Sequence, residues 1–279
     1  MGTLRQAGHV VSVVLPCSNN SGMAKAYNFG KVLRPYHYTP PTIDGNDASE
    51  PWILVDGTPA SCVQLGIYHL FSDRAPVDLV ISGPNYGHNL TSVYNLASGT
   101  LGGGLEAALC GKRAVSLSFA FGDHLVPGDD GVHSTELIAA ASRLSLRLIE
   151  RLFQDWHAAV EVYHINIPPL SAPWDPPPVF WTTAVRSSLS TASIFQPLET
   201  DCRPGAVSDE NALQPVRWAP RFTDVKKSLD DAPPGTDAWA LKRGFIGLVG
   251  TDKRLLHRML TIESKNHPYA SVSTRDSSS

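Results

Sequence analysis

The sequence is poor in the features that mark secreted, membrane-spanning or nucleic-acid-binding proteins. Four of its 279 residues are cysteine, and they are widely spaced with no CxxC pair, unlike a disulfide scaffold or a zinc site. No apolar run reaches the roughly 18 residues that a membrane span needs. The formal net charge of −3 gives no general attraction to nucleic acid or to an anionic membrane. We therefore expect a cytoplasmic protein without membrane or nucleic-acid partners.

Several catalytic signatures are missing as well. The sequence contains no G-x-S-x-G nucleophile elbow and no H-E-x-x-H zinc motif, which disfavours serine hydrolases and zinc proteases of those kinds. What is present is the composition of an ordinary globular enzyme, with 42% apolar and 18% charged residues. At 279 residues the chain is long enough to bury the core of a large α/β domain.

Hydrophobic patterns predict alternating strands and helices as far as residue 168. Continuous apolar runs are typical of buried parallel strands, and capped or amphipathic helices separate them. The predicted strands are 9–15, 27–33, 52–55, 77–81, 114–121 and 160–167, and the predicted helices are 58–71, 99–111 and 134–153. Residues 4–8 have the pattern of a last helical turn closed by Gly8. This alternation favours a doubly wound α/β fold with a mostly parallel, Rossmann-like sheet.

Beyond residue 168 the sequence changes character. Proline-rich segments and scattered tryptophans indicate a less regular extension packed on the sheet over residues 169–250. Residues 251–279 end in a serine-rich stretch, and we expect this tail to be disordered. The predicted division is therefore an α/β core over 1–168, a C-terminal part of the same domain over 169–250, and a tail.

The most informative segment follows the strand 77–81. It reads Ser82-Gly83-Pro84-Asn85-Tyr86-Gly87-His88-Asn89, and ligands of open α/β sheets bind outside the carboxyl ends of the strands. Ser98-Gly99-Thr100 then opens a helix, whose first backbone N–H groups and two hydroxyls suit a phosphate group. From spacing alone, a capped helix after a surface loop fits equally well. Ser21 follows the strand 9–15, where an ordinary turn serine is the simpler interpretation.

Further segments complete a set of motifs. They are Val14-Leu15-Pro16 with Ser21-Gly22, Gly57-Thr58-Pro59-Ala60-Ser61-Cys62-Val63, and Val162-Tyr163-His164-Ile165-Asn166-Ile167-Pro168. Arg217-Trp218-Ala219-Pro220 and Thr236-Asp237-Ala238-Trp239-Ala240 follow later in the chain. Together with the two motifs above, and in this order, these segments resemble the survival protein SurE family of phosphatases and 5′-nucleotidases, the last two resembling fungal-type members. The resemblance covers about residues 4–245.

The resemblance implies a metal-dependent phosphomonoesterase whose substrates are small phosphomonoesters such as nucleoside 5′-monophosphates. It implies a divalent cation, Mg²⁺ or Mn²⁺, that polarises a phosphate oxygen and lowers the pKa of a bound water, and it implies a homodimer. The general acid stays open. By position, the resemblance assigns Ser21 and Asn85 to the metal, Ser98, Gly99 and Thr100 to the phosphate, and His88 and Asn89 to further substrate contacts.

The sequence departs from the family pattern ahead of Leu4. The family has a first strand and an Asn-Asp-Asp-Gly loop there, and its two aspartates complete the metal site. A hydroxyl and an amide carbonyl are neutral donors, which hold a hard cation weakly. The simplest interpretation is an N-terminally truncated sequence whose incomplete metal site reduces or abolishes its activity, with an exposed sheet edge where the strand is missing. Gly128-Asp129-Asp130-Gly131 contains two adjacent aspartates like those of the missing loop, but we interpret it as a solvated turn.

Two other functions fit parts of the sequence. Gly102-Gly103-Gly104-Leu105-Glu106-Ala107 matches the dinucleotide pattern G-x-G-x-x-A, with Asp123 further on, as in an oxidoreductase. That pattern needs its glycines directly after a strand, whereas residues 82–98 intervene here. A non-catalytic SurE-like binding domain is the second alternative, because the metal aspartates are absent. Tight NAD(P) binding would favour the first, and metal-stimulated phosphate release would exclude the second.

Overall fold

The computed structural model describes residues 2–40, 51–120, 135–168, 176–191, 193–198 and 213–252. Within these residues the larger sheet has five strands in the order β4-β5-β6-β10-β7. They are β4 (Leu79–Tyr86), β5 (Arg113–Phe119), β6 (Val160–Ile167), β10 (Ile246–Asp252) and β7 (Val179–Trp181). β4, β5 and β6 are parallel, and β10 runs antiparallel to β6. The predicted α/β fold with a mostly parallel sheet is confirmed.

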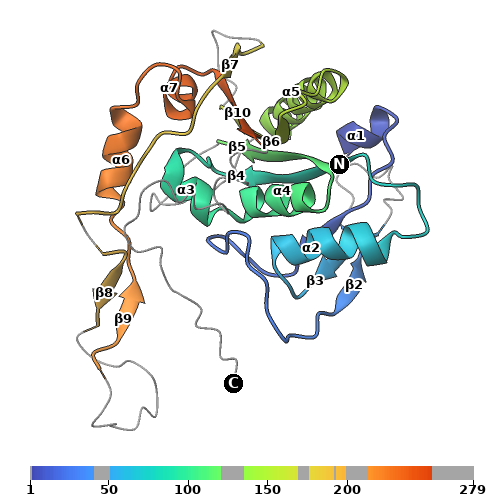
Figure 1. Ribbon diagram of the computed structural model, residues 1–279, viewed down its shortest axis with the longest axis horizontal. Coiled ribbons are helices and arrows are strands. Elements are labelled where there is room, and N and C mark those ends of the chain that lie inside the picture. Colours follow the sequence, from blue (N-terminus) through green and yellow to red (C-terminus); the bar gives the residue numbers. More distant parts are fainter. Residues whose placement is uncertain are drawn as a thin grey trace, which may run out of the picture.

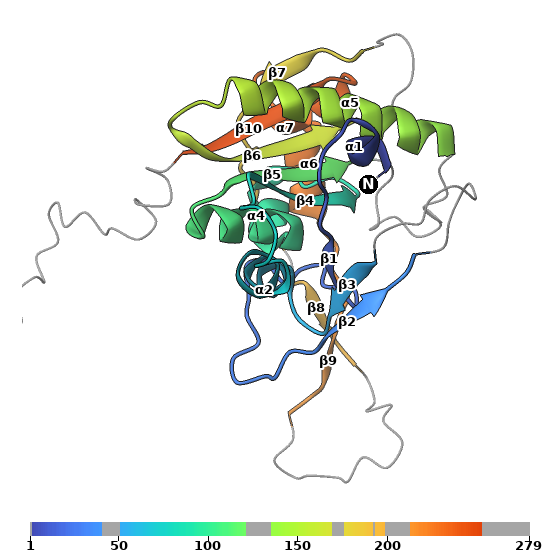
Figure 2. The ribbon, with the colours of Figure 1, turned by 90° about the vertical axis from the view of Figure 1, so that its right-hand side faces the viewer.

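Helices cover both faces of this sheet (Figures 1 and 2). α5 (Thr135–Gln154) packs its apolar stripe on one face, against Leu117, Tyr163 and Ile165 among others. α4 (Gly99–Leu109) packs on the other face, against Ala114 and Val162. Side chains that point from β5 and β6 toward α4 are partly polar and buried, namely Ser116, Ser118, His164 and Asn166.

A second, smaller sheet contains β1 (Val14–Pro16), β3 (Trp52–Val55) and β2 (Pro35–Tyr38) in the order β1-β3-β2. β1 is parallel to β3, and β2 is antiparallel to it. α2 (Pro59–Leu65) continues as a π-helical turn, η1 (Gly66–Leu70), and packs on this sheet. Thr58 is its N-cap, accepting a hydrogen bond from the Ser61 N–H, as predicted.

No ladder joins β1 to β4 within the described part of the chain, so each of these strands has an unpaired edge. The apolar residues at the start of β4 are only half-buried, whereas those of β5 and β6 are mostly buried. This agrees with the exposed sheet edge that the sequence predicts.

Three predicted elements differ from the structure. The strand 9–15 is reduced to β1, because the residues before Val14 have no ladder partner and Val10 is 89% exposed. The prediction of a strand at 27–33 is wrong, because these residues form no strand and the nearest one, β2, begins at Pro35. The segment 82–98, predicted as a loop, holds the end of β4 and a helix, α3 (Thr91–Ala97). The helical turn near the start is confirmed as α1 (Gly2–Gln6), followed by Gly8 at φ +90°.

The C-terminal part adds β7 and β10 to the larger sheet and places one helix beside α3 and a second beside β10 (Figure 1). These are α6 (Thr223–Asp230) and α7 (Asp237–Lys242), and a hairpin of β8 (Phe195–Pro197) and β9 (Val216–Trp218) precedes them. The division at residue 168 stays a prediction. The tail beyond residue 252, Asp123 and the turn 128–131 lie outside the described residues. None of the described helices has the length and apolar character to cross a membrane.

Candidate functional site

The loop that carries Ser21 lies against the junction of α3 and α4. The Ala24 N–H donates to the Ala97 carbonyl at 2.9 Å. A Cβ on Gly99 would lie 3.2 Å from the Asn20 carbonyl oxygen, and one on Gly102 would lie 2.2 Å from the Ala24 carbonyl oxygen. Backbone therefore meets backbone here, an approach that only glycine allows. Figure 1 shows this dark-blue loop beside α4.

The first turn of α4 is the segment predicted to hold phosphate. Ser98 is its N-cap, and the Ser98 hydroxyl accepts from the Leu101 N–H at 3.1 Å. The N–H groups of Gly99 and Thr100 belong to the first turn and have no intrahelical acceptor. They lie at the positive end of the helix dipole, where an anion is stabilised. Ser98 and Gly99 are buried, and Thr100 is half-buried.

Asn85 lies near the carboxyl end of β4, opposite Ser118 of β5. Its Nδ2 donates to the Gly87 carbonyl at 3.1 Å, which leaves Oδ1 as an acceptor. A Cβ on Gly103 would lie 2.5 Å from the Ser82 Oγ, so α4 packs directly on β4. Because a crossover helix runs antiparallel to its strands, the Asn85 end of β4 lies toward the first turn of α4.

The two predicted substrate contacts have different surroundings. Asn89 is buried, donates from Nδ2 to the Ser118 Oγ at 2.9 Å, and donates its N–H to the Asn166 Oδ1 at 3.0 Å. These bonds attach the loop after β4 to β5 and β6. His88 is half-buried, and its ring centroid lies 5.5 Å from that of Tyr94 on α3. A substrate role for either residue stays a prediction.

The candidate metal ligands are both neutral. Ser21 is exposed, with its N–H on the Asn19 Oδ1 at 2.8 Å, and the described residues contain no hydrogen bond between Ser21 and Asn85. Nor do those residues contain any group of three His, Cys, Asp or Glu side chains able to hold a metal ion. Mg²⁺ and Mn²⁺ prefer carboxylate oxygens. A hydroxyl and an amide therefore do not by themselves fit either ion, and the metal role of Ser21 and Asn85 stays a prediction.

Two acidic residues that the sequence motifs contain, Glu106 and Asp237, are buried, which the sequence analysis does not predict. Glu106 of α4 is 1% exposed and binds Lys25, Tyr27 and Gln64. Asp237 is fully buried at the start of α7. A carboxylate inside an otherwise small and apolar helix was the available signal for Glu106, because buried charges occur almost only with partners.

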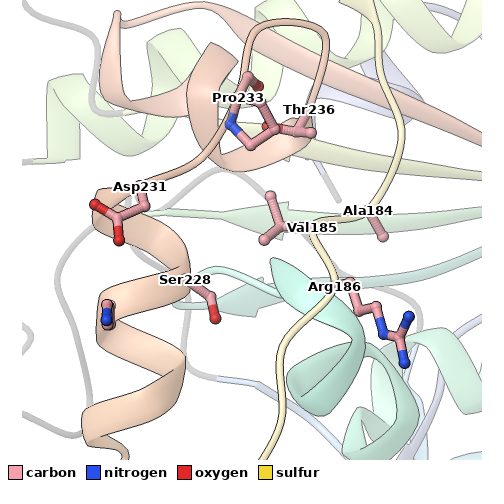
Figure 3. Close-up of a pocket in the computed structure, with 8 residues that line it drawn as sticks. Ala184, Val185, Arg186, Ser228, Asp231, Pro233 and Thr236 are labelled. Carbon is pink, nitrogen blue, oxygen red and sulfur yellow. Dashed lines mark hydrogen bonds between the residues drawn. The ribbon is translucent and has the colours of Figure 1, made fainter.

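Two surface pockets of the described residues do not include the predicted site residues. One, of about 380 Å³, lies between α6 and the extended segment 184–186 (Figure 3). Its lining residues are Ala184, Val185, Arg186, Lys227, Ser228, Asp231, Pro233 and Thr236. Figure 3 shows the Arg186 guanidinium directed away from Asp231. The other, of about 350 Å³, lies between α2 and residues 27–33.

Comparisons with known proteins agree with the fold. The family model "Survival protein SurE" matches residues 1–190. The chain is 34% identical over 232 residues to 5′-nucleotidase SurE of Ruegeria pomeroyi, covering 81% of this chain and 79% of that protein. It is 28% identical over 239 residues to 5′-nucleotidase SurE of Methanoregula boonei, covering 85% and 80%. The SurE crystal structure from Aquifex aeolicus matches with a TM-score of 0.57 and 24% identity, covering 90% of this chain and 87% of that one.

A further relative carries a different name. The chain is 33% identical over 181 residues to the "Probable tubulin--tyrosine ligase PBY1" of Saccharomyces cerevisiae, covering 64% of this chain. It spans 23% of that protein's length, so the activity in that name is not carried over to this chain.

The dinucleotide alternative does not fit the structure, because Gly102, Gly103 and Gly104 lie inside α4 rather than in a loop after a strand. The family model covers more than half of the chain, and the nucleotidase relatives match along most of their length. The chain belongs to the survival protein SurE family, a family of phosphatases and nucleotidases.

Proposed function

We propose that this chain is a phosphomonoester-binding domain of the SurE type, with the Ser98-Gly99-Thr100 turn as its phosphate site. The observation that carries the proposal is the docking of the Ser21 loop on that turn, through Ala24 on Ala97 and Asn20 on Gly99. Two segments far apart in the sequence thereby meet at a helix N-terminus whose first N–H groups favour an anion. Small phosphomonoesters are the substrate class.

Hydrolysis is the second part of the proposal. The nucleotidase names of the relatives support it, with Mg²⁺ or Mn²⁺ as the cofactor and with Ser21 and Asn85 among its ligands. Because these two donors are neutral, we expect weak metal binding and slow turnover from the chain as it stands. The same donor chemistry favours the alternative, a SurE-like domain that binds phosphomonoesters without cleaving them. A homodimer is also proposed, and light scattering would test it.

The deciding experiment combines phosphate binding with turnover. Isothermal titration with inorganic phosphate should show saturable binding, and Thr100→Val should weaken it about tenfold, because a hydrogen bond to a charged group contributes about 1.5 kcal/mol. Thr223→Val on exposed α6 is the matched control and should bind as the wild type does. Release of p-nitrophenol from its phosphate ester that rises with Mn²⁺ would support the enzyme, and binding without release would support the binding domain. Absence of phosphate binding would reject both.

The substrate class is narrowed by a row of aromatic rings that includes Tyr94 of α3. His88, Tyr94, Phe222 and Trp218 follow one another with centroids 5.5, 5.6 and 6.4 Å apart, and Trp218 is 59% exposed. Tyr94 is one helical turn before Ser98. An exposed indole face suits a nucleobase, which supports a nucleoside 5′-monophosphate as the ligand.

Replacing Trp218 with alanine should therefore weaken the binding of adenosine monophosphate without affecting the binding of a ligand that has no base. We expect about a tenfold loss for the nucleotide, since stacking of a base on an aromatic ring contributes about 1–3 kcal/mol. Ribose 5-phosphate should bind equally to both proteins. Trp181→Ala, an exposed tryptophan on β7 at the other edge of the larger sheet, is the control. Equal losses for both ligands would remove the base from the proposal.

A further inference from the structure

Glu106 is a buried carboxylate that joins three parts of the chain. Its Oε2 lies 2.7 Å from the Lys25 Nζ and accepts from the Tyr27 hydroxyl at 2.5 Å. Its Oε1 accepts from the Gln64 Nε2 at 2.5 Å. Lys25 and Tyr27 belong to the loop region after β1, Gln64 to α2 and Glu106 to α4. The side chain therefore acts as a cross-link between segments that are distant in the sequence.

The charge of Glu106 is compensated by these partners. Burial by itself raises the pKa of the Glu106 carboxyl, but hydrogen bonds from Lys25, Tyr27 and Gln64 outweigh it and hold that pKa below its ordinary value. Lys25 is 27% exposed, donates to the Tyr27 hydroxyl at 3.0 Å, and lies 4.4 Å from the Tyr27 ring centroid. Removing one member of such a buried set leaves the others without a counter-charge or an acceptor.

The Glu106 cross-link lies at one of the two ends of the Ser21 loop. At the first end, the Cys17 N–H donates to the Val55 carbonyl at 2.8 Å. At the second end, Ala24 adopts φ +49°, an uncommon conformation for alanine, and the backbone of Ala24 and Lys25 packs on Gly102. The Lys25 side chain then reaches Glu106, one helical turn after Gly102 in α4. Both ends of the loop are thus attached, with Ser21 between them.

We propose that Glu106 is a positioning residue, which through Lys25 and Tyr27 holds the Ser21 loop on the Ser98–Thr100 turn. This inference rests on the proposed phosphate site and adds a residue that sets its geometry. A carboxylate is required because Lys25, Tyr27 and Gln64 all donate to it, as does the Cys110 thiol at 3.8 Å. A glutamine there has one amide nitrogen in place of an acceptor, so at least one partner loses its bond.

The test measures loop attachment and phosphate affinity separately. In Glu106→Gln, limited trypsin digestion should cleave after Lys25 faster than in the wild type, and inorganic phosphate should bind about tenfold more weakly by titration calorimetry. Tyr27→Phe removes a single donor and is the milder variant, with an expected loss of about threefold in phosphate affinity. These figures correspond to about 1.4 and 0.7 kcal/mol at the usual conversion.

Two further variants separate positioning from stability. Lys25→Met should weaken phosphate binding as much as Glu106→Gln does. Lys25→Arg should keep the wild-type affinity for phosphate, because arginine retains the positive charge. Glu150→Gln removes an exposed partner of His9 far from the loop and should bind as the wild type does. Lower melting temperatures with unchanged phosphate affinity and unchanged cleavage after Lys25 would overturn the inference. A wild type that binds no phosphate would reject the proposed function, and the cleavage rates alone would then decide whether Glu106 holds the loop.

Discussion

Gly102→Ala should lower the free energy of unfolding by about 3 kcal/mol, the upper range for overpacking a well-packed site. The added Cβ would lie 2.2 Å from the Ala24 carbonyl oxygen and 2.8 Å from the Lys25 nitrogen. Both are backbone atoms held by the Ala97 and Glu106 contacts, so neither can move aside cheaply. Helix propensity alone predicts the opposite sign, since alanine exceeds glycine by about 1 kcal/mol inside a helix.

Urea denaturation followed by circular dichroism would measure this effect. Gly66→Ala is a matched control, because Gly66 has helical backbone angles and an added Cβ would meet only a Val14 side-chain methyl group, at 3.3 Å. We expect that control to be neutral or slightly stabilising. If Gly102→Ala were as stable as Gly66→Ala, the Ser21 loop would not pack on α4. The proposed phosphate site would then consist of the Ser98–Thr100 turn without the Ser21 loop.

Asp237 should make stability fall as pH rises between about 4 and 6. Its side chain is fully buried, and Oδ1 accepts from the N–H groups of Ala238 at 2.7 Å and Val185 at 3.1 Å. Burial raises the pKa of Asp237 to about 6, although backbone N–H groups, including that of Thr91, act in the opposite direction. Above the unfolded value of 3.8 the unfolded chain releases this proton while the folded chain keeps it. Ionisation then favours unfolding until the folded group also titrates.

The measurement is the free energy of unfolding of the wild type minus that of Asp237→Asn. This difference should fall by about 3 kcal/mol between roughly pH 3.5 and pH 6.5 and stay level above, because one pKa unit corresponds to about 1.4 kcal/mol. Asp224→Asn is a control of opposite sign. The hydrogen bonds from Thr191 lower the pKa of Asp224, so its contribution is lost as pH falls. A flat difference for Asp237→Asn would show that Asp237 ionises in the folded chain as it does in the unfolded one.

The elements that the sequence predicted correctly are those whose own residues decide them. The strand predicted at 160–167 matches β6 because β-branched and aromatic residues alternate there with other side chains, so that Tyr163, Ile165 and Ile167 all lie on the face that packs in the core. The helix predicted at 134–153 matches α5 because its apolar stripe has helical period. Thr58 and Ser98 act as N-caps because each hydroxyl binds a backbone N–H three residues on. The family, too, followed from short motifs in order.

Tertiary contacts decided the rest. The N-cap residue of α3 is Leu90, whose side chain cannot cap the helix, and the N–H groups of Ser92 and Val93 donate instead to the Val185 carbonyl and the Ser187 hydroxyl. Those partners are distant in the sequence, so no local pattern could predict the helix. The three glycines of α4 likewise fit a dinucleotide motif in the sequence. The contacts with Ala24, Ser82 and Ser116 show instead that these glycines allow close packing of a helix on a loop and a sheet. Only the tertiary structure could decide this, because a glycine is required where neighbouring atoms occupy the space of a Cβ, and those neighbours are distant in the sequence.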